Sequence, residues 1–265
     1  AHEWLSSDSM ARPPSTTPPR RLPMPYRSIF AILPIIAAAI ICQAWASPAE
    51  VALRAGRIEP VVRTMHGWTV HVDPALLAGE HKEAGGRALS MLDNHLERIA
   101  ILVEGKRLAD MRTLEIWIEW QHGALTNMQY HPSVHWLRHH QHDERLAKKV
   151  HIPVARDLLS RSQLLKHPAV ILHELAHAYH DQILGFDNPE IFRCFQAAQK
   201  QKSYDKVLAH TGRQVRHYAL SNHKEYFAEG TEAFLYRNDF FPFVRAELAR
   251  HDPKLHELLA KIWGP

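Results

Sequence analysis

The chain has 265 residues, of which 46% are hydrophobic and 23% are charged, and this allows one substantial globular domain. The formal net charge is +4, and it falls to +2 when residues 1–46, with four arginines and two acids, are left out. Such a weak basic excess, which is not clustered in a stripe, argues against nucleic acid as a partner. Only Cys194 lies beyond residue 46, so that part of the chain cannot form an internal disulfide.

The first 46 residues differ in composition from the rest. Residues 11–25 hold six prolines among serine, threonine and arginine, and this predicts a disordered extension over residues 1–28. An apolar run and a small-residue motif ending at Ala46 are typical of a secretory signal peptide, predicted over residues 29–46. We therefore expect a secreted or periplasmic protein with no stable membrane span after cleavage. The alternative is a membrane anchor formed by an uncleaved signal.

A single domain is expected over residues 47–265. Alternating apolar residues predict strands at Trp68–Val72 and over residues 114–120, with a helix between them over residues 80–103. Residues 150–154 predict a short strand that Pro153 restricts to an edge or an end. This strand is either an ordinary edge or a place where an extended peptide substrate pairs. Further helices are expected over residues 189–202, 222–237 and 253–263, which together give an α+β fold with a mainly helical second half.

Histidines are frequent between the second and third predicted strands, at positions 131, 135, 139, 140 and 142. Their partial four-residue spacing resembles a metal site, but Pro132 disfavours a helix there and no carboxylate pattern accompanies them. We therefore expect an exposed loop near the substrate cleft.

The motif H-E-x-x-H stands at residues 173–177, within a stretch of apolar residues at helical spacing. Positions four apart share one face of a helix, so His173 and His177 can direct their imidazoles at one point. Two neutral imidazoles suit Zn²⁺. Glu174 lies about 100° around the helix, where it can reach a metal-bound water as a general base but is poorly placed as a ligand.

A third ligand is expected from residues 222–230, which contain Glu225 and Glu229 on one helical face. One carboxylate can bind zinc while the other orients a ligand histidine. We favour Glu225 as the ligand, with Glu229 as the alternative. A capping box of Asn222 with Glu225 is the structural interpretation of the same residues. His180, one turn beyond His177, is a further alternative to Glu225.

The H-E-x-x-H stretch, Tyr218 and the segment Glu225-Tyr-Phe-Ala-Glu229 resemble the catalytic domain of the anthrax lethal factor-like zinc metallopeptidases, of the gluzincin type. The resemblance covers roughly residues 168–237 and implies a zincin-like fold. It implies that Glu225 binds zinc, that Glu229 and Asp181 support the ligands, and that Tyr218 contacts the substrate oxyanion. Gly230 departs from the family pattern, which has alanine there.

Taken together, these residues predict a zinc metalloendopeptidase with one Zn²⁺ per chain and a peptide or protein substrate. Glu174 would take the proton from the metal-bound water, and the phenol of Tyr218 would stabilise the oxyanion. His217 and His223 are alternatives to Tyr218 for that task. The competing interpretations are a non-catalytic zinc-binding interaction module and a zinc amidase acting on a cell-wall substrate.

Overall fold

The computed structural model describes residues 57–264. The predictions of an N-terminal extension and a signal peptide fall on residues 1–46 and lie outside these described residues. Within residues 57–264, no helix combines the length and the apolar character needed to span a bilayer.

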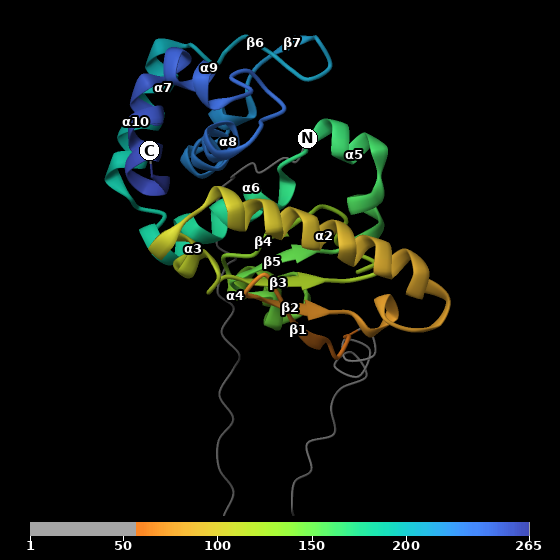
Figure 1. Ribbon diagram of the computed structural model, residues 1–265. Helices are drawn as coiled ribbons and strands as arrows, with labels where there is room; N and C mark the ends of the chain where they lie inside the picture. The colour runs from red at the N-terminus through yellow and green to blue at the C-terminus, as the bar shows by residue number, and fades with distance from the viewer. Residues whose placement is uncertain (1–56, 265) are drawn as a thin grey trace, which may run out of the picture. The chain divides into compact units, whose positions relative to one another are not determined.

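A five-stranded mixed sheet forms the first half of the described chain (Figure 1). Its strands follow the order β1-β2-β3-β5-β4, so β1 and β4 lie at the two edges. The three inner strands are parallel, and each edge strand is antiparallel to its neighbour. The strands span Val61–Met65 (β1), Trp68–Val72 (β2), Glu115–Ile118 (β3), Gln129–Tyr130 (β4) and Lys149–Ile152 (β5).

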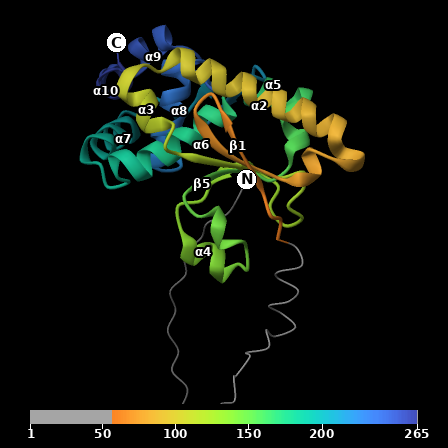
Figure 2. The ribbon, with the colours of Figure 1, turned by 60° about the horizontal axis from the view of Figure 1, so that its bottom comes forward.

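Alternation along the strands separates the two faces of the sheet. Ile116 and Ile118 of β3 belong to the main hydrophobic core, beneath the long helix α2 (Lys82–Leu102), which is followed by α3 (Gly105–Met111). Trp117, between those two isoleucines, points to the opposite face and packs in a smaller cluster with Leu137 and Leu146. The helix α4 (Val134–His139) covers this second face, as the turned view shows (Figure 2).

The prediction that residues 150–154 form an edge strand is wrong. The strand β5 lies inside the sheet, parallel to β3 and antiparallel to β4. Pro153 comes directly after Ile152, the last residue of β5, and a proline is tolerated where the hydrogen-bonding ladder ends. The edge beside β5 is instead the two-residue β4, which is too short to carry a periodic pattern.

The prediction of an exposed histidine loop over residues 131–142 holds only in part, because His135, His139 and His140 are exposed but the segment contains a helix. Residues Val134–His139 form α4, and Pro132 stands before the helix, where it removes no helical hydrogen bond. The hydroxyl of Ser133 caps the helix by accepting from the backbone N–H of Trp136 (3.2 Å). His131 is buried and contacts the ring of His151 on β5.

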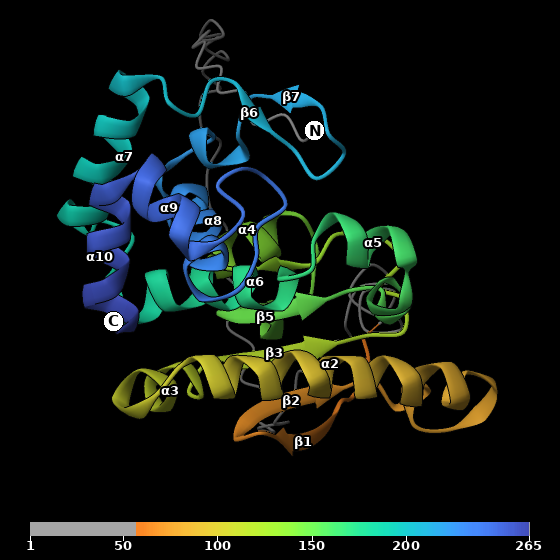
Figure 3. The same cartoon turned by 45° about the horizontal axis from the view of Figure 1, so that its top comes forward.

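The second half is mainly helical and gathers on one side of α6, beyond the sheet (Figure 3). Between α7 and α8, the chain forms a small hairpin and a 3-10 turn, Tyr218–Leu220. A π-helical turn, His180–Leu184, extends α6. The remaining elements are α5 (Arg161–Lys166), α6 (Val170–Tyr179), α7 (Pro189–Gln201), β6 (Val207–Leu208), β7 (Gln214–Val215), α8 (His223–Leu235), α9 (Arg245–His251) and α10 (Pro253–Trp263).

Candidate metal centre

The helix α6 runs through the middle of the molecule and carries the H-E-x-x-H motif. Nine of its ten residues are buried, His173 and Glu174 among them. A helix that is apolar on nearly every side must be covered all round, and the sheet, α2 and α8 provide that cover. The two motif histidines, four residues apart, lie on the side of α6 that faces α8.

The helix α8 begins at a cap that leaves Glu225 free to face α6. The side-chain oxygen of Asn222 accepts hydrogen bonds from the backbone N–H groups of Lys224 (2.9 Å) and Glu225 (3.0 Å). The Glu225 carboxylate reaches both motif histidines. The cap and the ligand geometry therefore coexist, because the cap uses the backbone of Glu225 and the histidines use its side chain.

Three ligand-type atoms converge between the two helices. Oε2 of Glu225 lies 3.2 Å from Nε2 of His173 and 3.2 Å from Nε2 of His177, and the two Nε2 atoms are 3.1 Å apart. A tetrahedral zinc with bonds of about 2.0 Å keeps its ligand atoms about 3.3 Å from one another. The triangle therefore has the size that a tetrahedral zinc requires, and one coordination position stays free.

The charges of this triangle act on one another. Burial alone lowers the pKa of His173, but hydrogen bonds to Glu225 and Glu232 raise it well above its usual range. Burial raises the pKa of Glu225, but the two histidines beside it hold it well below its usual value. Two imidazoles and a carboxylate brought together thus favour a positive charge between them, which either a proton on His173 or a metal ion can supply.

Glu174 lies next to this triangle without joining it. Only 7% of its surface is exposed, and its Oε2 accepts a hydrogen bond from the backbone N–H of Tyr130 on β4 (2.8 Å). Burial raises the pKa of the Glu174 carboxyl, while His173 and His177 act in the opposite direction. A carboxylate with a raised pKa is a better proton acceptor, which is what a general base needs.

Glu229 and Glu232 follow Glu225 on the same face of α8, and they behave differently. Oε1 of Glu232 lies 2.6 Å from Nδ1 of His173, whereas the Glu229 carboxylate comes no closer to that atom than 3.9 Å. The Glu229 carboxylate instead accepts from the side-chain amide of Asn238 (2.8 Å). The structure thus places Glu232, which the sequence analysis did not single out, where Glu229 was expected. The sequence could have indicated Glu232 by its position seven residues after Glu225, because that spacing puts both on one helical face.

Tyr218 lies on the 3-10 turn just before α8 and is 50% exposed. Burial of its inner half and the nearby charge of Glu225 raise the pKa of its phenol. A phenol that keeps its proton near the triangle remains a hydrogen-bond donor.

Asp181, on the π-helical turn after α6, has partners other than the two motif histidines. Its carboxylate accepts from the hydroxyl of Tyr130 (2.6 Å) and pairs with the ammonium group of Lys148. It therefore ties the β4 end of the sheet to the π-helical turn. Among residues 57–264, no hydrogen bond joins it to either motif histidine, so the expectation that it supports a ligand histidine finds no contact there.

The other histidines considered from the sequence have different partners. His180 is fully buried between Phe186 and Phe227 and is not part of the triangle. Nδ1 of His217 accepts from the backbone N–H of Ala219, and Nε2 of His223 donates to the carbonyl of Phe186.

Comparisons with known proteins do not assign a family. No family model matches the sequence, and no curated protein matches it. Among solved structures, the PRO-PRO endopeptidase PPEP-2 from Paenibacillus alvei is similar with a TM-score of 0.40 and 22% identity, over 70% of this chain and 92% of that chain. A likeness of this degree does not establish a shared fold. The described fold is α+β, and the class of site is a candidate metal centre built on an H-E-x-x-H helix.

Proposed function

We propose that this protein is a zinc-dependent endopeptidase. The observation that carries the proposal is the triangle of His173, His177 and Glu225, whose size fits zinc and which leaves a coordination position free beside the buried Glu174. A purely structural zinc site is normally closed by four protein ligands and needs no base.

His173, His177 and Glu225 would hold the ion. Zinc bound there supplies a Lewis acid that makes a water acidic and polarises a substrate carbonyl. Glu174 takes the proton of the attacking water and returns it to the leaving amine. The phenol of Tyr218 donates a hydrogen bond to the oxygen on which negative charge develops.

The edge strand β4 supports a peptide as the substrate. The backbone N–H of His131 donates to Lys149 (3.1 Å), and the carbonyl of His131 accepts from Lys148 (2.7 Å), so these groups face β5. Alternation along a strand turns the backbone of the preceding residue, Tyr130, outward, where its N–H meets Glu174. An extended peptide that pairs with this edge would pass the general base.

The test combines metal analysis with cleavage of a degenerate peptide library. We expect about one zinc per chain in the wild type. Glu174→Gln should retain the zinc and lose at least about 10²-fold in hydrolysis, because it removes the base but no ligand.

Zinc-loaded wild-type protein that cleaves no peptide would refute the endopeptidase. If the same protein released amines from isolated cell wall, and Glu174→Gln abolished that release, the chain would be a zinc amidase. If it were inert in both assays and unfolded on chelation, the zinc would serve stability.

A further inference from the structure

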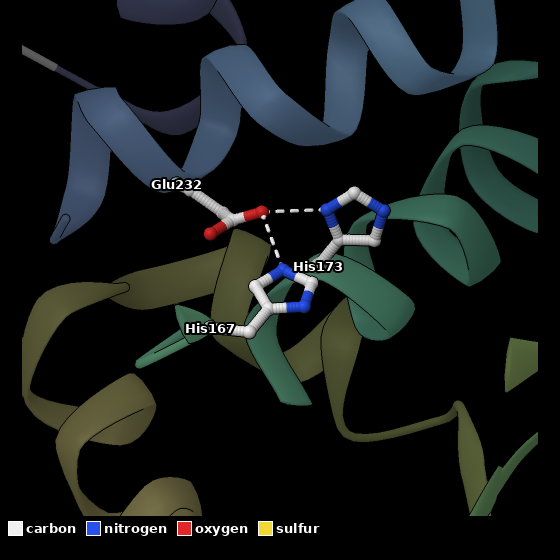
Figure 4. Close-up of side chains that lie close together, drawn as sticks. All are labelled: His167, His173 and Glu232. Carbon is white, nitrogen blue, oxygen red and sulfur yellow. Dashed lines mark hydrogen bonds and ion pairs between the residues drawn. The ribbon is translucent and has the colours of Figure 1, made fainter. Parts of the chain in front are cut away.

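A second group of three side chains meets on the far side of His173. Oε1 of Glu232 lies 2.6 Å from Nδ1 of His173 and 3.2 Å from Nε2 of His167 (Figure 4). Glu232 is fully buried, and its other oxygen has no hydrogen-bond partner among the described residues. Both histidines therefore direct their contacts to a single oxygen of one carboxylate.

The distances distinguish a hydrogen-bonded group from a second metal site. Ligand atoms around a tetrahedral zinc are about 3.3 Å apart, and the triangle around Glu225 approaches that value on every edge. The 2.6 Å contact between Glu232 and His173 is much shorter. It lies at the short end of charge-assisted hydrogen bonds, for which about 2.7–2.9 Å is usual.

We propose that Glu232 is the positioning residue of the zinc site and that His167 holds Glu232 in place. This inference rests on the proposed zinc site. By accepting the Nδ1–H of His173, Glu232 fixes the tautomer that leaves the Nε2 lone pair of His173 facing His177 and Glu225. The contact also fixes the rotation of the ring, because Nδ1 and Nε2 lie on opposite sides of the imidazole.

Glu229 occupies the neighbouring turn but lacks this geometry. Its carboxylate is 3.9 Å from Nδ1 of His173 and is already bound by Asn238. The three glutamates of α8 therefore have different partners. Glu225 would bind the metal, Glu229 accepts from Asn238, and Glu232 accepts from His173.

His167 gives Glu232 a second donor from outside the motif helix. It precedes α6, and its Nε2–H reaches the oxygen that also receives His173. A buried carboxylate needs hydrogen-bond donors to remain in place. Loss of His167 should therefore act on zinc only through Glu232, and its effect should be smaller than the loss of Glu232 itself.

The experiment measures the zinc dissociation constant by competition with a chromophoric chelator. For Glu232→Ala we expect binding to weaken about 10- to 100-fold, the usual cost of losing a carboxylate behind a metal-binding histidine. Glu232→Gln preserves the shape and serves if the alanine variant does not fold; it should also weaken binding. His167→Phe should weaken it less than Glu232→Ala does.

Two comparisons identify the cause. Asp252→Asn changes another buried carboxylate, whose partners among residues 57–264 are Tyr204, Tyr226 and the backbone of Leu255 rather than the proposed ligands. It should leave the zinc affinity unchanged. Long-range ¹H–¹⁵N spectra of the zinc-loaded protein should show His173 protonated at Nδ1, with a strongly downfield proton that shifts upfield in Glu232→Ala. A merely structural role would not move that resonance.

The inference is overturned if Glu232→Ala and Glu232→Gln bind zinc as tightly as the wild type, or if Glu229→Gln causes the larger loss. If the wild type binds zinc and both Glu232 variants have the same zinc affinity, the role of Glu232 is refuted and the endopeptidase proposal is not affected. Wild-type protein that binds zinc but cleaves nothing would sink the endopeptidase and leave the role of Glu232 intact. Wild-type protein that binds no zinc would sink both.

Discussion

The buried ring of His180 should lower the free energy of unfolding, and its replacement by leucine should raise it. The ring is 0% exposed, and neither of its nitrogens has a hydrogen-bond partner among the described residues. It packs against the rings of Phe186, Phe227 and His223, and none of them gives it a hydrogen bond. An unsatisfied buried polar group costs about 1–3 kcal/mol. His180→Leu, which is of similar size, should therefore raise the free energy of unfolding at pH 7.5 by about that amount.

The same residue should make the fold sensitive to acid. Burial, followed by the nearby His223, lowers the pKa of His180 from 6.5 to about 3. The folded state then binds fewer protons than the unfolded state between these values, so stability is full above pH 6.5 and falls as the pH decreases. At pH 5 the loss from this one group is about 2 kcal/mol, since each pKa unit is worth about 1.4 kcal/mol.

The assay is urea unfolding of the metal-free protein at pH 7.5 and pH 5.0, with the two midpoints and slopes compared for each variant. The wild type should lose about 2 kcal/mol more than His180→Leu between these pH values. The exposed His135 on α4 provides the matched control, and His135→Leu should keep the wild-type pH dependence. A His180→Leu protein that is less stable at pH 7.5 and equally acid-sensitive would show that the ring is hydrogen-bonded and the reasoning wrong.

Three further outcomes follow from the contacts described above. Tyr218→Phe should lower kcat about 10- to 100-fold with zinc affinity and KM unchanged, because the phenol would act on the developing charge. A change in KM by steady-state kinetics, or in zinc affinity by chelator competition, with kcat unchanged would contradict this role. Tyr226→Phe should reduce the free energy of unfolding by about 1.5–3 kcal/mol, because its hydroxyl is buried and bonds the Asp252 carboxylate; a difference in urea unfolding below 0.5 kcal/mol would contradict this. Asn222→Ala should cost about 1 kcal/mol through the lost cap of α8, whereas Asn222→Asp should cost much less in the same measurement.

The parts of the site that depend on local periodicity could be predicted from the sequence. A four-residue spacing is a property of any helix, so the sequence alone was enough to place His173 and His177 on one face of α6. Glu225 was proposed because the H-E-x-x-H motif lacks a third zinc ligand and because Glu225 and Glu229 stand on one face of a later predicted helix. In the same way, the strand Trp68–Val72 follows from its strict alternation.

The parts that depend on long-range pairing could not be predicted. The strand β4 has two residues, and only its pairing with β5 and its hydrogen bond to Glu174 make it visible. Glu232 acquires its role because α8 packs on α6 at one particular rotation, which periodicity does not determine. The helix α4 was missed because Pro132 was taken as a helix breaker, although it stands outside the helix.

The spacing of the three glutamates on α8 has a consequence for how this chain can change in length. One extra residue between Glu225 and Glu232 would turn the second carboxylate by about 100° around the helix axis, away from His173. Such an insertion should therefore weaken zinc binding as the loss of Glu232 does, and it should also destabilise the fold, because residues 226–234 of α8 are all buried. Insertions in the hairpin between β6 and β7, around Gly212, leave the rotation of α8 untouched and should be tolerated.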